Sequence, residues 1–146
     1  MPAPINLPAL IEFYQTLSEQ SIARFGDFYS PRAYFKDPFN EVHQLSEIEH
    51  IFRHMFTQVQ APRFHVTDSM SNADSAVLVW EFHYQLKSST KIPQQAGLIR
   101  GVSHLRFDSL GKVSFHRDYW DSSEELYMQI PLIGWVLRQL RRRLAA

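Results

Sequence analysis

The fold is indicated most clearly by the stretch SEIEHIFRHMFTQVQAPRFHVTDS, residues 46–69, in which the spacing of apolar residues changes. Up to Val59 they recur every three or four positions, as on one face of a helix. Ser46 and Glu49 have the spacing of a capping box, in which each side chain bonds a free amide of the first turn. After Pro62 the pattern becomes strand-like. The stretch therefore predicts a helix from Ser46, followed by a strand over Arg63–Ser69.

Three more strand-like segments follow, over Ala76–Leu86, Ala96–Asp108 and Lys112–Trp120. The links between the four strands, at residues 71–74, 87–95 and 109–111, are polar or contain glycine, as hairpin turns do. We therefore expect consecutive strands to pair in antiparallel fashion.

The segment before residue 46 predicts two helices and a short strand. The first helix carries an apolar stripe with Asn6 as its cap, and the second runs from Ile22 and ends before Pro31. The short strand, Ala33–Phe39, is broken by a turn at Asp37-Pro38. Helices that precede a run of strands predict an α+β fold, and we expect a cone-shaped roll in which N-terminal helices pack on a curved antiparallel sheet and enclose a pocket.

The C-terminal segment returns to helical spacing from about residue 122 to 144, with arginines near its end. We expect Pro131 and Gly134 to divide it into two pieces. The whole chain, 1–146, is expected to be one domain, with a core of about 7–121 and this helix as an extension.

Composition narrows the classes of function. Of 146 residues, 45% are hydrophobic and 14% aromatic, which favours a packed interior with ring-lined walls. Fifteen basic and fifteen acidic residues cancel, so we expect no nucleic-acid partner. The lack of cysteine suits a reducing compartment, and the sequence shows neither a signal peptide nor a membrane-spanning stretch, so we expect a cytoplasmic protein.

The order of these elements, with the motif Tyr34-Phe35-Lys36-Asp37-Pro38 before the Ser46 helix and the hairpin Ser103–Val113, resembles the nuclear transport factor 2-like superfamily. The resemblance is to its SnoaL-like and ketosteroid isomerase-like branch and covers about residues 7–121. It implies a roll with a pocket, in a superfamily that includes isomerases, cyclases, dehydratases, epoxide hydrolases and non-catalytic binders.

The resemblance also implies roles for particular residues. In the steroid isomerases a carboxylate at the Asp-Pro position moves a proton, while a first-helix tyrosine and a strand carboxylic acid hold the oxyanion. Asp37 and Tyr14 occupy the first two positions here, and Ser103 occupies the third. A serine cannot act as that acid, although it can donate a weaker hydrogen bond, so we do not expect ketosteroid isomerase activity.

Strand alternation gives further candidate pocket residues, because every second side chain faces the same way and the resemblance implies which face is inward. Our candidate catalytic residues are Asp37, Tyr14, His116 and Asp118, and our candidate ligand-binding residues are Trp80, Phe82, Ser103, Trp120 and Phe56. We expect a small apolar ligand with one polar function, and neither a cofactor nor a metal.

Structural explanations compete with these roles. Asp37 before a proline is also an ordinary turn residue. His116 and Asp118 have the spacing of a base and its orienting partner, but also of two metal ligands or of a polar pair that satisfies itself. His50 and His54, one helical turn apart, lie opposite the apolar stripe, where we expect a solvated face.

Two hypotheses follow for the whole protein. The first is a cofactor-free isomerase, cyclase, dehydratase or hydrolase with Asp37 as its general base. The alternative is a non-catalytic ligand-binding or dimerising module. We expect a homodimer through the outer sheet face, which carries Val79, Glu81, His83, His104 and Arg106. We expect the basic C-terminal helix to dock on its own domain or on a partner subunit rather than on a membrane.

Overall fold

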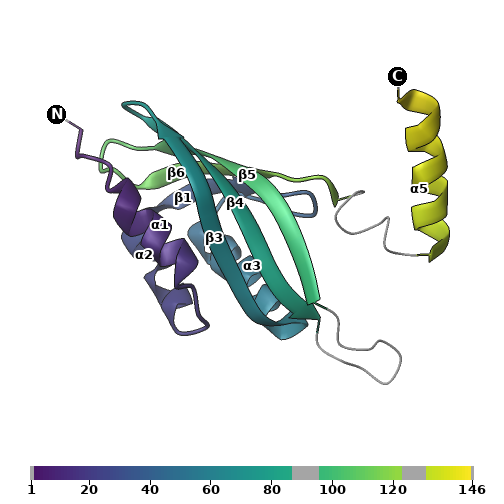
Figure 1. Ribbon diagram of the computed structural model, residues 1–146. Coiled ribbons are helices and arrows are strands. Elements are labelled where there is room, and N and C mark those ends of the chain that lie inside the picture. Colours follow the sequence, from purple (N-terminus) through teal and green to yellow (C-terminus); the bar gives the residue numbers. More distant parts are fainter. Residues whose placement is uncertain (1, 87–95, 123–130, 146) are drawn as a thin grey trace.

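The computed structural model describes residues 2–86, 96–122 and 131–145 and confirms the predicted α+β roll (Figure 1). Its helical elements are α1 (Leu7–Gln15), the 3-10 helix η1 (Ser21–Arg24), α2 (Phe25–Phe28), α3 (Leu45–Gln58) and α5 (Pro131–Leu144). Its strands are β1 (Tyr29–Lys36), β2 (Glu41–Val42), β3 (Val59–Ser71), β4 (Ser75–Leu86), β5 (Ala96–Phe107) and β6 (Val113–Tyr119).

The six strands form one sheet in the order β2-β1-β6-β5-β4-β3. The antiparallel pairing predicted for the four long strands is confirmed. The sheet is not antiparallel throughout, however, because β1 lies parallel to β6, with Phe35 opposite His116. This pairing joins segments about eighty residues apart, and hairpin signals in the sequence report only on neighbouring strands. The predicted turn at residues 87–95 lies outside the described residues.

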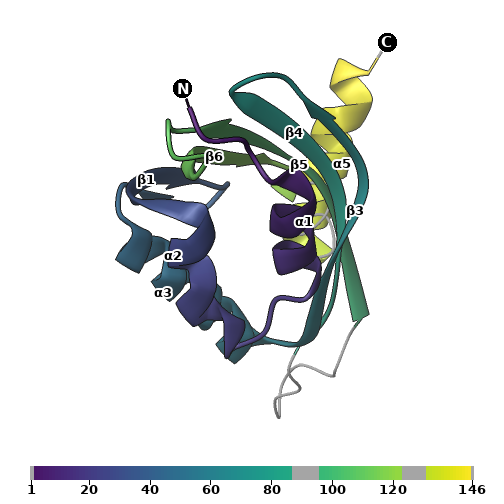
Figure 2. The same ribbon diagram turned by 90° about the vertical axis from the view of Figure 1, so that its left-hand side faces the viewer.

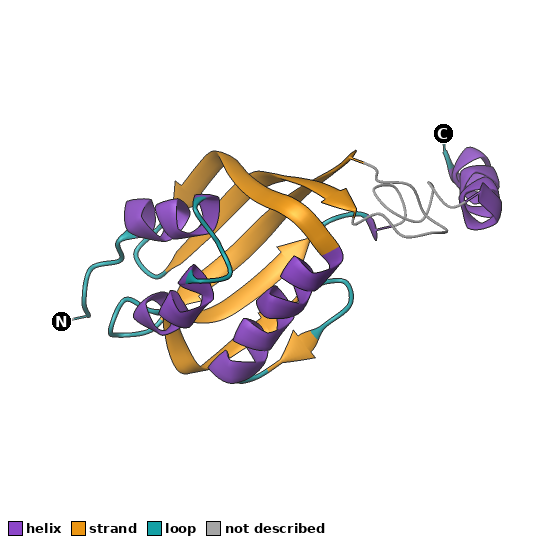
Figure 3. Cartoon of the chain, turned by 90° about the horizontal axis from the view of Figure 1, so that it is seen from below, coloured by secondary structure: helices purple, strands orange, loops and turns teal. Residues whose placement is uncertain are grey.

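The sheet is strongly curved, and the helices α1, α2 and α3 lie on its concave side (Figures 2 and 3). The core forms between them. Its largest fully buried side chains are Tyr29, Phe25, Phe35, Ile22, Ile48, Leu78, Leu105 and Val113. The fold therefore directs the inward side chains of the sheet toward the apolar faces of the helices.

Two local predictions need correction. Helix α3 begins at Leu45 rather than Ser46, and the Ser46–Glu49 capping box is not formed. Instead Glu47 Oε2 accepts a hydrogen bond from the backbone N–H of His43 at 3.2 Å, because Glu47 is the acidic residue in the first turn. The first strand starts at Tyr29, earlier than predicted, and Pro31 lies within it at a register shift, where its missing N–H interrupts no ladder bond.

The C-terminal helix α5 continues through Gly134, so the predicted break at that residue is wrong. Residues 123–130, where the tail was predicted to begin, lie outside the described residues. Figures 1 and 3 show α5 standing apart from the sheet. Within the described ranges, the helices are too short or too polar to span a bilayer.

Candidate functional site

Strand alternation positions most of the candidate pocket side chains. Along β4 every second residue from Ala76 to Tyr84 is buried, so Trp80 and Phe82 face inward as predicted. On β5, Ser103 is 5% exposed and faces the same way. On β6, His116 is 4% exposed and is followed on the same face by Asp118. Three neighbouring strands therefore direct polar groups into an otherwise apolar interior.

These side chains line two adjoining cavities of different size. The larger cavity has a volume of about 330 Å³, and the smaller one has a volume of about 30 Å³. Four residues line both cavities: Phe52, Phe64, Trp80 and Asp118. The smaller cavity is completed by Tyr14, Val66, Leu78, Ser103 and His116. A ligand in the larger cavity would therefore lie against a small, mostly apolar chamber that contains a few polar groups, with Asp118 between the two.

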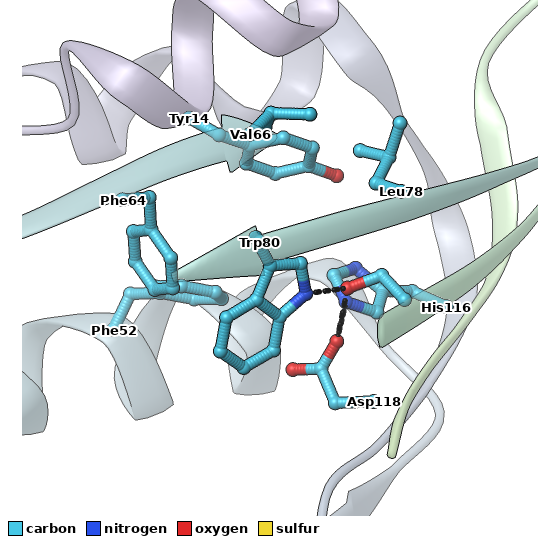
Figure 4. Close-up of a pocket in the computed structure, with 9 residues that line it drawn as sticks. Tyr14, Phe52, Phe64, Val66, Leu78, Trp80, His116 and Asp118 are labelled. Carbon is cyan, nitrogen blue, oxygen red and sulfur yellow. Dashed lines mark hydrogen bonds and ion pairs between the residues drawn. The ribbon is translucent and has the colours of Figure 1, made fainter. Parts of the chain in front are cut away.

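A continuous chain of hydrogen bonds joins polar side chains of the smaller cavity, and Figure 4 shows the part of it that links Trp80 to Asp118. The Tyr14 and Tyr29 hydroxyls are hydrogen-bonded to each other. The Tyr29 hydroxyl lies 2.6 Å from Nδ1 of His116, and Nε2 of His116 lies 2.6 Å from Oδ1 of Asp118.

The chain continues on the other side of Asp118. Ser103 donates from Oγ to the same Oδ1 at 2.5 Å, and Trp80 donates from Nε1 to Ser103 Oγ at 2.8 Å. Helix α1 and the strands β1, β4, β5 and β6 each contribute to this network.

Tyr29 is the member of the network that sequence analysis missed. Its side chain is 0% exposed, and its hydroxyl bridges Tyr14 and His116. In the sequence it completes the pattern of the second predicted helix, which gives no sign of a role in the site. Only the parallel pairing of β1 with β6, which no local signal predicts, brings it beside His116.

The donors in this network can be assigned from the two tyrosines. Burial raises the pKa of both Tyr14 and Tyr29 well above the ordinary value for tyrosine, so both hydroxyls keep their protons. A carboxylate oxygen beside Nε2 of His116 calls for a proton on that nitrogen, and Nδ1 then accepts from the protonated Tyr29 hydroxyl. Tyr14 then donates to Tyr29. In this arrangement each donor is used inside the network, and the chamber is lined by acceptors.

Asp118 keeps one carboxylate oxygen available. Its Oδ1 takes the bonds from Ser103 and His116, and in the described part of the chain no donor reaches Oδ2. The side chain is 16% exposed and lines both cavities. Figure 4 shows the second oxygen directed away from His116. A carboxylate oriented through one oxygen and open at the other has the geometry of a general base.

Asp37 has different surroundings. Its Oδ1 accepts from the backbone N–H groups of Phe39 at 2.8 Å and Asn40 at 2.6 Å, and the Asn40 side chain bonds both of its oxygens. Asp37 therefore closes the turn between β1 and β2, as the structural alternative anticipated. It also lines the larger cavity, at the end nearest Phe39. A catalytic role for Asp37 stays a prediction.

The remaining candidates divide between different places. Phe82 and Trp120 line the larger cavity, where the Trp120 ring meets Phe39 edge to face at 5.6 Å. Phe56 does not join them, because it lines a separate surface hollow with Leu17 and residues 59–62.

The helical histidines His50 and His54 are exposed, as predicted, but they also line the larger cavity. Among the described residues, no three histidine, aspartate or glutamate side chains come together in a way that would hold a metal ion.

Comparisons with known proteins agree with this architecture. A SnoaL-like polyketide cyclase from Agrobacterium tumefaciens shares 15% identity and a TM-score of 0.67, covering 84% of this chain and 93% of that one. A protein with a ketosteroid isomerase-like fold from Catenulispora acidiphila, solved in complex with trimethylamine, has 11% identity and a TM-score of 0.67, with coverage of 82% and 88%. An NTF2-like protein of unknown function from Burkholderia pseudomallei has 16% identity and a TM-score of 0.66, with coverage of 88% and 96%.

No functionally curated protein matches the chain. The family model of the SnoaL-like domain matches residues 10–116, a range that runs from the first helix to the buried histidine of the site. The roll, the pocket and this match lead to one conclusion: the chain belongs to the SnoaL-like domain family.

Proposed function

We propose that this protein is a cofactor-free enzyme that activates a water molecule and adds it to an apolar ligand. The observation that carries the proposal is the open Oδ2 of Asp118, which lies where the small chamber meets the larger cavity. We assign the general base to Asp118 rather than Asp37, because the oxygens of Asp37 already hold a turn.

The small chamber suits a single water. Its volume of about 30 Å³ is above what one water needs, and a buried water requires polar partners. Asp118 Oδ2 and the Tyr14 oxygen, both acceptors, supply partners for the two hydrogens of a water. A water between these two oxygens would keep its lone pairs for a ligand in the neighbouring cavity.

The proposed step balances within the site. The water oxygen bonds to an electrophilic carbon of the ligand, and one water proton passes to Asp118 Oδ2. The bond from that carbon to its leaving oxygen breaks, and Asp118 returns the proton to this oxygen. His116 and Ser103 hold the carboxylate through Oδ1 during both transfers, and Tyr29 keeps the His116 ring in place.

Incorporation of labelled oxygen tests this function without knowledge of the natural substrate. A panel of small apolar epoxides and esters would be incubated with the protein in ¹⁸O water, and the products analysed by mass spectrometry. We expect enzyme-dependent ¹⁸O incorporation that falls by at least about a hundredfold in Asp118→Asn, as for loss of a general base, and persists in Asp37→Asn. If ¹⁸O incorporation were lost in Asp37→Asn but not in Asp118→Asn, Asp37 would be the general base instead. Binding of panel members without turnover would favour the non-catalytic alternative.

We propose that the protein forms a homodimer through the outer face of the sheet. That face carries an aromatic and cationic cluster centred on Phe115, which stacks on Tyr34 at 5.1 Å and lies under Arg106 at 5.3 Å, with His104 at 5.4 Å. Rings and arginine are enriched at the centres of interfaces. Sedimentation at micromolar concentration should give a dimer that Phe115→Asp dissociates. A monomeric wild type would reject this assembly.

We also place the protein in the cytoplasm, because a chain without cysteine gains nothing from an oxidising compartment. Fractionation of cells that produce the protein at its natural level would test this placement.

A further inference from the structure

We propose that the larger cavity selects a positively charged organic ligand, and that Asp37 with Phe39 and Trp120 forms the subsite that recognises the charge. The proposal deepens the proposed function, because it names the class of substrate that would lie against the water chamber. It concerns binding alone, so it can be tested without turnover.

The charge on the cavity wall is the first observation. Two carboxylates, Asp37 and Asp118, line the larger cavity, and among its described lining residues there is no lysine or arginine. A carboxylate beside a partly desolvated ligand attracts a cation and repels an anion, because charges interact more strongly there than in bulk water.

The aromatic wall is the second observation. Seven of the sixteen lining residues are phenylalanine or tryptophan: Phe35, Phe39, Phe52, Phe64, Trp80, Phe82 and Trp120. The face of an aromatic ring carries partial negative charge, and tryptophan binds cations best. A ring-lined cavity with carboxylates therefore stabilises an organic cation through both its charge and its apolar groups.

The geometry of the turn places the charge subsite at one end of the cavity. Phe39 and Trp120 meet edge to face at 5.6 Å, with an interplanar angle of 76°, so their faces form a corner. Asp37 lines the same cavity and is two residues from Phe39. Backbone amides fix its Oδ1, whereas its Oδ2 takes one bond from the Asn40 side chain at 3.1 Å. That oxygen keeps capacity for a ligand cation.

This placement separates two roles. Asp118 lies at the boundary with the small chamber, where the proposed chemistry takes place, and Asp37 lies in the wall of the larger cavity alone. A substrate would then place its electrophilic carbon beside Asp118 and its cationic group against Asp37. Asp37 would set specificity rather than move a proton.

Binding of three matched probes tests the proposal: 2-phenylethylamine, which is cationic at pH 8, neutral 2-phenylethanol, and anionic 3-phenylpropanoate. Affinity would be measured by isothermal titration calorimetry. We expect the amine to bind at least about tenfold more tightly than the alcohol, as for one desolvated cation–π or ionic contact, and the anion to bind most weakly. Equal affinity for amine and alcohol, or no binding of the amine, would overturn the proposal.

Substitution locates the subsite. Asp37→Asn keeps an oxygen that can accept from the turn amides, so the fold is retained while the charge is lost. We expect it to remove most of the preference for the amine. Glu12→Gln, on the exposed face of α1, removes the same charge away from the cavity and should leave the preference unchanged. Loss of the preference in Glu12→Gln, or its retention in Asp37→Asn, would overturn the subsite.

The two proposals fail separately. If the amine is preferred but neither the neutral panel nor epoxides and esters that carry an amine group gain ¹⁸O, the cation subsite stands and the hydrolytic function falls. If neutral panel members gain ¹⁸O but the amine is not preferred, the function stands and the cation subsite falls.

Discussion

Replacement of Tyr29 by phenylalanine should destabilise the fold more than the same replacement of Tyr14, although both remove one buried hydroxyl. Tyr29 lies in the middle of the hydrogen-bond chain and contacts both the Tyr14 hydroxyl and His116 Nδ1. Tyr14 lies at its end, and among the described residues its hydroxyl bonds only that of Tyr29. The ring volume is unchanged in both variants, so packing should contribute little to the difference.

The magnitudes follow from counting the bonds that are lost. Tyr14→Phe removes one hydrogen bond and should lower the free energy of unfolding by about 0.5–1.5 kcal/mol. Tyr29→Phe removes two and leaves His116 Nδ1 buried without its partner, so its cost should be about 2–4 kcal/mol. Once Tyr29 is replaced, the Tyr14 hydroxyl has no side-chain hydrogen bond left to lose within the described network. The double variant should therefore resemble Tyr29→Phe within about 0.5 kcal/mol.

Urea unfolding of the four proteins at pH 7.5, followed by circular dichroism and tryptophan fluorescence, measures these differences. The slope of free energy against urea should stay constant, which would show that the same surface is exposed on unfolding. If Tyr29→Phe costs no more than Tyr14→Phe, or if the two effects add, then the chain does not act as a connected unit and its assignment is wrong.

Further predictions concern pH, a packed glycine and a helix end. Because burial raises the pKa of Tyr14 and Tyr29 above that of unfolded tyrosine, 10.0, their contribution to stability is intact below pH 10. Above pH 10 this contribution falls by up to about 1.4 kcal/mol per pH unit for each tyrosine. The urea midpoint, measured from pH 8 to 11, should therefore depend less on pH in the phenylalanine variants than in the wild type. Gly101→Ala places a Cβ 2.4 Å from the Trp80 ring. This clash should lower the free energy of unfolding by about 1–3 kcal/mol and shift the tryptophan fluorescence emission. An unchanged spectrum would show that the Trp80 ring does not pack against Gly101. Glu47→Gln weakens the hydrogen bond from the His43 backbone N–H at the start of α3. It should lower the stability measured by thermal unfolding by about 0.5–1 kcal/mol at low salt and by less at high salt. A loss of stability that does not depend on salt would exclude a contribution from the charge of Glu47.

The strands, their hairpin order and their inward faces were accessible from the sequence, because these are local properties. Alternation along β4 and β5 placed Trp80 and Ser103 on the inner face, and the structure agrees. The predicted helix start at Ser46 was wrong, because the three-residue spacing of Ser46 and Glu49 also occurs between Gln44, the N-cap of α3, and Glu47. The structure shows that Glu47, not Glu49, bonds the chain where it enters the helix.

The sequence by itself determined the family and the roll, through the resemblance of its motifs, and it put His116 and Asp118 on one face of a strand, since residue spacing fixes which side chains share a face. Only the tertiary structure decided that Tyr29 joins them and that Asp37 closes a turn. It also decided that one oxygen of Asp118 stays open toward a cavity. The physical reason is that hydrogen-bond partners are chosen by distance in space, and the parallel pairing of β1 with β6 brings together groups that lie 87 residues apart in the chain.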